Sequence, residues 1–195
     1  MNTDLAPEQS LKLIESMIRQ AKRSFQRLSF YFLLWGVLLI AAMLATYLLR
    51  DMDPATGKGA PWGVAGFAGG FISMVYGARQ GRRERVINAM DGLIGWLWAS
   101  FVITMIITIA VSLAAHRDPG PMITLLTGIP TFMTGRIMRF RPLIMGGVIF
   151  WVAGAVMHFT QDAFTITMIY CAAMVLGYIL PGLLLKRMED GLRTT

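Results

Sequence analysis

The residues with the clearest capacity for chemistry are two short pairs of histidine and aspartate. His116 lies two residues before Asp118, and His158 lies four residues before Asp162. Imidazole nitrogens together with carboxylate oxygens can bind a divalent metal ion. The alternative is that both pairs belong to polar loops at one face of a membrane and bind nothing. The four residues are therefore candidate metal ligands whose spacing alone does not define a site.

Other reactive groups are scarce in the apolar parts of the sequence. The single cysteine, Cys171, lies in an apolar segment, so a disulfide within the chain is excluded. Asp, Glu, Lys and Arg are absent from the six apolar segments defined below, although such residues mark proton relays and ion sites inside membranes. The sequence also lacks an HExxH motif. We therefore expect a protein that is not an enzyme and that holds no cofactor.

The stretch 121–140 combines hydroxyl-bearing, small and helix-breaking residues. Threonines recur there at helical spacing, two glycines lie beside them and a proline interrupts them: Thr124, Thr127, Gly128, Pro130, Thr131, Thr134 and Gly135. A proline frees one backbone carbonyl inside a helix, and broken helices line substrate sites in transporters. A kinked and closely packed helix uses the same residues. The two interpretations are a packing surface and a narrow polar path that Ser73 would complete.

Small residues also follow helical spacing in the neighbouring segments. They are Gly63, Gly66, Gly70, Ser73 and Gly77 in the second segment, Gly147 and Gly154 in the fifth, and Gly177 and Pro181 in the sixth. Lipid tails are as apolar as leucine, so membrane helices associate by the close backbone approach that small residues allow. We expect the even-numbered segments to lie near the centre of a helical bundle.

Composition and segmentation predict an all-α membrane protein. Of the 195 residues, 55% are hydrophobic and only 15% are charged, against about 25% charged residues in a soluble domain. Six apolar segments reach or approach the ~20 residues that cross a bilayer. They lie at about 29–49, 62–78, 92–115, 121–135, 142–159 and 164–185. Short loops with turn residues between them predict six transmembrane helices arranged as three antiparallel hairpins.

Basic residues alternate from one connection to the next. Of the 18 Lys and Arg residues, only Arg50, Lys58 and Arg117 fall on one side of the predicted membrane. The positive-inside rule then places both termini of this multi-pass protein in the cytoplasm. The same distribution accounts for the net charge of +7. The basic loops lack interleaved aromatic residues, so no nucleic-acid partner is expected.

Residues 1–28 precede the first apolar segment and predict a basic amphipathic helix. Pro7 suits the first position of a helix, and apolar residues then recur every three or four positions up to Leu28. We expect this leader to lie on the membrane surface with a bend near Leu28. The alternative is one helix that runs unbroken into the first span. The chain thus divides into the leader 1–28, a bundle over 29–185 and a cytoplasmic tail 186–195.

Four stretches resemble a family of small bacterial six-span inner-membrane proteins to which no activity is assigned. They are PEQSLKLIESMI, SFYFLLWG, LTGIPTFMTGRIMRFRPLIMGGVIFW and YILPGLLLKR. The resemblance covers nearly the whole chain and implies architecture but no functional residues. The hairpin layout is also similar to that of the six-span acid-resistance membrane family, which is an analogy of layout alone.

Three functions remain open on these grounds. The first is a non-enzymatic protein that acts by association, as a scaffold, accessory subunit or regulator of a membrane assembly. Its partners would be the lipid bilayer and other membrane subunits or a second copy of the chain. The second is a small transporter or channel for an uncharged or weakly polar solute. The third, an enzyme acting at the outer face, depends on the histidine and aspartate pairs.

Overall fold

The computed structural model describes residues 7–51, 59–81 and 89–191, and every regular element in these ranges is a helix. Five are single α-helices: α1 (Pro7–Leu48), α3 (Ala60–Gly81), α4 (Ala89–Ala114), α5 (Gly120–Ile137) and α6 (Arg141–Phe159). The last is a continuous rod of α7 (Ala163–Met174), the π-helical turn η1 (Val175–Ile179) and α8 (Leu180–Gly191). The prediction of an all-α chain with six helical segments is confirmed.

Four of these segments are long and apolar enough to cross a membrane. Within the described residues they are Leu28–Leu48, Gly92–Ala114, Arg141–Phe159 and Ala163–Met188. The predicted spans in α3 and α5 have a lower mean hydropathy, because glycine, proline or threonine takes the place of large apolar residues in them. The number of helices that could span a membrane on length and composition is thus four rather than the predicted six.

The first helix is longer than a membrane is thick. α1 has 42 residues, or about 63 Å at 1.5 Å per residue, against a hydrocarbon core of about 30 Å. It continues through Leu28, so the expected bend there was wrong and the alternative of an unbroken helix is the observed one. Gly36 does not interrupt it, because Tyr178 and Ile179 of the last rod pack directly against this position.

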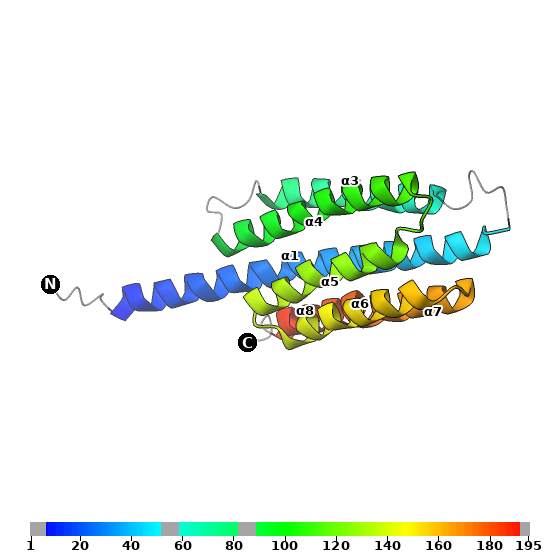
Figure 1. Ribbon diagram of the computed structural model, residues 1–195. Coiled ribbons are helices and arrows are strands. Elements are labelled where there is room, and N and C mark those ends of the chain that lie inside the picture. The colour runs from blue at the N-terminus through cyan, green and yellow to red at the C-terminus, as the bar shows by residue number, and fades with distance from the viewer. Residues whose placement is uncertain (1–6, 52–58, 82–88, 192–195) are drawn as a thin grey trace.

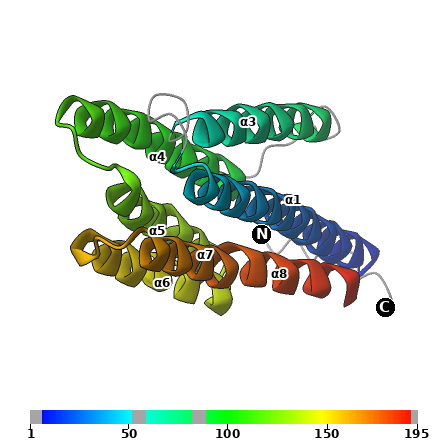
Figure 2. The same cartoon turned by 90° about the vertical axis from the view of Figure 1, so that its right-hand side faces the viewer.

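The helices form a closely packed part and a peripheral part (Figure 1). In the packed part, α1 lies along α7, η1 and α8, and α6 packs against the same rod. The closest pair is α5 and α6, which belong to different predicted hairpins. In the peripheral part, α3 packs on α1 and α4 packs on α5 (Figure 2). The expected central position is therefore wrong for α3, the second segment.

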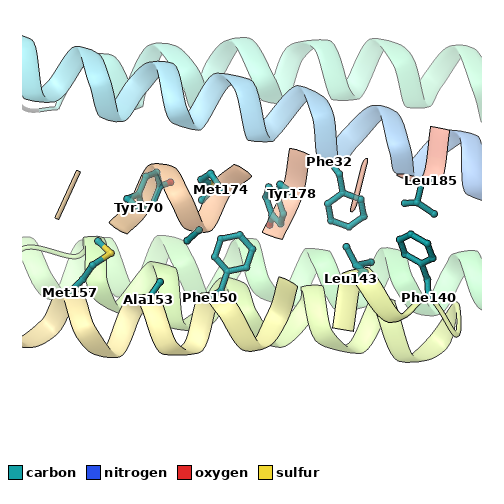
Figure 3. Close-up of a cluster of buried hydrophobic side chains, with 11 residues drawn as sticks. Phe32, Phe140, Leu143, Phe150, Ala153, Met157, Tyr170, Met174, Tyr178 and Leu185 are labelled. Carbon is teal, nitrogen blue, oxygen red and sulfur yellow. The ribbon is translucent and has the colours of Figure 1, made fainter. Parts of the chain in front are cut away.

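The hydrophobic core lies between α1, α6 and the last rod (Figure 3). Phe150 and Leu143 of α6 and Leu185 of α8 are fully shielded, and Phe32 of α1 is 3% exposed. By contrast, Ile94 is the only described residue of α4 that is buried, and the rest of its apolar stretch is exposed or half-buried. The packed part thus has a core of its own, whereas α3 and α4 present most of their apolar side chains outward.

Candidate functional site

Glycines allow α5 and α6 to approach each other closely. Gly128 and Gly135 in α5 are seven residues apart, as are Gly147 and Gly154 in α6. Seven residues are about two helical turns, so each pair lies on one face of its helix. A Cβ atom on Gly147 would lie 2.6 Å from Cβ and 2.7 Å from the backbone N of Phe132. The two backbones therefore touch where glycine leaves room.

The other three glycines make equivalent contacts along the pair. A Cβ on Gly154 would lie 2.7 Å from the backbone N of Leu125, and one on Gly135 would lie 2.6 Å from that of Ile144. A Cβ on Gly128 would overlap the indole of Trp151 and lie 2.8 Å from the carbonyl oxygen of Gly147. Any side chain at these four positions must push the helices apart, because backbone cannot rotate away as a flexible side chain can.

Pro181 gives the last rod its irregular turn. It has no N–H to donate to the carbonyl of Gly177, four residues earlier. Directly before it, the backbone widens into the π-turn η1, in which the N–H of Leu180 donates to the carbonyl of Val175. The Gly177 carbonyl oxygen lies 2.8 Å from where a Cβ of Gly146 would be. Gly146 and Gly177 thus bring α6 and the π-turn into backbone contact.

The threonines of α5 are buried and bond inside their own helix. Thr124, Thr127 and Thr131 donate to the carbonyls of the residues four positions earlier, at 2.7–2.9 Å. Thr131 and Thr134 are both 0% exposed. Thr134 accepts a hydrogen bond of 3.2 Å from the indole Nε1 of Trp98 on α4. This bond fastens the peripheral α4 to the packed part.

The aromatic rings of Phe32, Phe150 and Tyr178 lie together in the core (Figure 3). Tyr178 of the π-turn has ring-centroid distances of 5.0 Å to Phe150, 5.2 Å to Phe32 and 6.5 Å to Trp98. The Tyr178 hydroxyl lies near the Thr131 side chain. The stripe is therefore lined by packed rings and by hydroxyls that already have partners. The second interpretation, a polar path, would need these groups to separate.

Ser73 does not join the threonine stripe. It lies on α3, which packs on α1, and its backbone carbonyl accepts a hydrogen bond of 3.4 Å from the hydroxyl of Tyr31. The side-chain oxygen of Ser73 is buried without a hydrogen-bond partner among the described residues. Gly77, one turn further along α3, faces the same Tyr31 hydroxyl. The predicted path through Ser73 and the threonines is not assembled in this arrangement.

The remaining glycines of α3 face away from the chain. A Cβ on Gly63, Gly66 or Gly70 would meet none of the described residues within 4 Å. Contact with α1 is made instead by Gly69, which lies against Trp35 and Leu38. The part of the small-residue face from Gly63 to Gly70 is thus uncovered by the other described residues, whereas Ser73 and Gly77 lie against α1.

The candidate metal ligands have separate local roles. Asp118 accepts a hydrogen bond from the N–H of Gly120 at the start of α5. Asp162 caps α7, where the hydroxyl and the N–H of Thr165 donate to it and lower the pKa of its carboxyl. His158 lies edge-on to Phe159, and His116 follows the end of α4 with a positive φ of 52°. Among the described residues, no three His, Cys, Asp or Glu side chains gather as a metal site would require.

The sequence did not indicate the role of several residues that pack around the threonines and glycines described above. Tyr178, Trp98 and Phe150 read as ordinary apolar residues of their segments. Gly69 is directly followed by Gly70, and only its contact with Trp35 distinguishes it from that neighbour.

Comparison with family models, with curated proteins and with solved structures gives no match to this chain.

Proposed function

We propose that this chain is a non-enzymatic integral membrane protein that acts by association, as a scaffold, accessory subunit or regulator of a larger membrane assembly. The observation that carries the proposal is the uncovered face of the peripheral helices. Among the described residues, nothing lies within 4 Å of a Cβ at Gly63, Gly66 or Gly70 of α3, and Ile94 is the only buried residue of α4. Small residues on an open helix face allow another helix to approach closely within a bilayer.

In this proposal all six helices cross the membrane. α3 and α5 are the less apolar two, but glycine is common in membrane helices, and Arg79 and Arg136, both exposed, can extend toward the lipid head groups. The charge distribution supports cytoplasmic termini, and the family resemblance supports a bacterial inner membrane. The resemblance to a family of small six-span inner-membrane proteins agrees with this topology.

The closed threonine stripe favours association over transport. Its hydroxyls donate to their own helix, so they offer few free donors to a passing solute. Packing around Thr131 and Thr134 leaves both fully shielded. A solute path would require a second arrangement of α5 and the π-turn, in which the packed groups around Thr131 and Thr134 separate.

Leucine at Gly66 and Gly70 tests the association. The double variant Gly66→Leu, Gly70→Leu should fold as the wild type does, because neither position has a neighbour within 4 Å and leucine has the higher helix propensity. It should weaken association by about tenfold or more, since leucine holds another helix away. Native mass spectrometry after gentle extraction from the source membrane measures the stoichiometry.

Ala78→Leu is the matched control. Ala78 is also an exposed small residue of α3, but at 100° per residue it lies on a different face from Gly66 and Gly70. It should leave the stoichiometry unchanged. The proposal fails if the wild type is a lone monomer, or if the double variant keeps the wild-type stoichiometry.

A further inference from the structure

The C-terminal end of the last rod carries a groove with apolar walls and a basic rim. The groove has a volume of about 200 Å³ and is lined, among the described residues, by Leu180, Leu183, Leu184, Lys186 and Arg187. Four of these positions recur at intervals of three, one and three residues, so they share one face of α8. Lys186 and Arg187 are exposed. Apolar surface therefore leads directly to two cations.

Three further cations lie at the same end of the packed part. They are Arg136, Arg139 and Arg141, and all three are exposed. Phe140, which sits between the last two, belongs to the same core cluster as Leu143 and Leu185 (Figure 3). The turn between α5 and α6 thus lies next to α8. None of these five cations forms an ion pair with another described residue.

This combination matches the chemistry of an anionic phospholipid. Basic pockets beside membrane helices on the cytoplasmic side bind lipid phosphates, and an acyl chain is complementary to a row of leucines. The apolar stretch of the last rod ends at Met188, so the cations stand where the head groups begin. Glu189 and Asp190 follow Met188 further along α8.

We propose that this groove is a binding site for one anionic phospholipid. The phosphate would lie between Lys186, Arg187 and the arginines of the α5–α6 turn, and an acyl chain would lie along Leu180, Leu183 and Leu184. The inference rests on the membrane embedding in the proposed function but not on association with another protein. If no lipid bound in this groove, the association test with the Gly66→Leu, Gly70→Leu variant would keep its meaning.

Lipid titration followed by native mass spectrometry tests the site. Purified protein in detergent is titrated with phosphatidylglycerol or with phosphatidylcholine of the same acyl chains. We expect a one-to-one adduct with phosphatidylglycerol at concentrations where phosphatidylcholine gives little. Arg187→Gln and Lys186→Gln should each weaken the phosphatidylglycerol adduct by about fivefold. Both positions are exposed, and equal melting temperatures would show that folding is unchanged.

Arg79→Gln is the matched control, because Arg79 is an exposed arginine at the same predicted membrane side but on α3. It should leave the adduct unchanged. Equal binding of the two lipids would overturn the proposal. So would an equal loss of binding in Arg79→Gln, which would indicate diffuse attraction by net charge. Displacement of the lipid by millimolar inorganic phosphate would assign the site to a free anion and would overturn it as well.

Discussion

Replacing Gly147 by alanine is expected to separate α5 from α6 and to lower the free energy of unfolding by on the order of 3 kcal/mol. The added Cβ would lie 2.6 Å from Cβ, 2.7 Å from N and 2.8 Å from Cα of Phe132. Two of these atoms are backbone, so the strain cannot be relieved by a change of rotamer. The contact surface between the two helices would have to open along its length.

Unfolding by a denaturing detergent in mixed micelles measures this free energy. Gly95→Ala is the control, because Gly95 is also a helical glycine and a Cβ there would meet nothing within 4 Å. That change should be neutral or should stabilise the protein by up to about 1 kcal/mol, since alanine is the better helix former. If the two variants were equally stable, the backbone contact between α5 and α6 would be contradicted.

Replacing Phe150 by alanine should cost about 3–5 kcal/mol of unfolding free energy, because it leaves a cavity at the centre of the core. The Phe150 side chain is 0% exposed. Its ring packs at 5.0 Å from that of Tyr178 and fills the space that Gly177 leaves in the π-turn. Loss of the ring removes contacts from α6 and from the last rod together.

Phe159→Ala supplies the comparison within the same helix. Phe159 ends α6 and is 87% exposed, so its removal should change the unfolding free energy by less than about 0.5 kcal/mol. The same denaturation experiment serves for both. A similar cost for the two phenylalanines would show that Phe150 does not occupy the core described for it.

The helical segments could be predicted because each apolar run ends at charged or turn-forming residues. The glycines at which α5 and α6 touch were recognised by their helical spacing, but the two helices were assigned to different hairpins and their pairing was not predicted. The same reasoning misplaced α3. Its glycines have the same spacing, but spacing does not say whether a face meets a helix of its own chain. Gly69 contacts Trp35 and Leu38 of α1, whereas a Cβ on Gly70 would meet none of the described residues within 4 Å.

Other features depend on contacts between distant parts of the chain. Pro181 predicts that the carbonyl of Gly177 lacks its helical hydrogen bond. It does not predict that the backbone forms a π-turn there, or that this turn contacts Gly146. The threonine stripe was visible, whereas its closure depends on Tyr178 and Trp98, which come from other helices. The leader was expected to bend, because its amphipathic pattern suits a membrane surface. In the structure α8 packs along α1, and α1 stays straight through Leu28.

Photo-crosslinking inside the source membrane tests the central claim most directly. A photoreactive amino acid is placed at Gly70, on the uncovered face of α3, and separately at Ala78, on another face of the same helix. We expect a protein adduct of one defined mass from position 70, its loss in the Gly66→Leu background, and lipid adducts alone from position 78. Lipid adducts alone from both positions would contradict that claim.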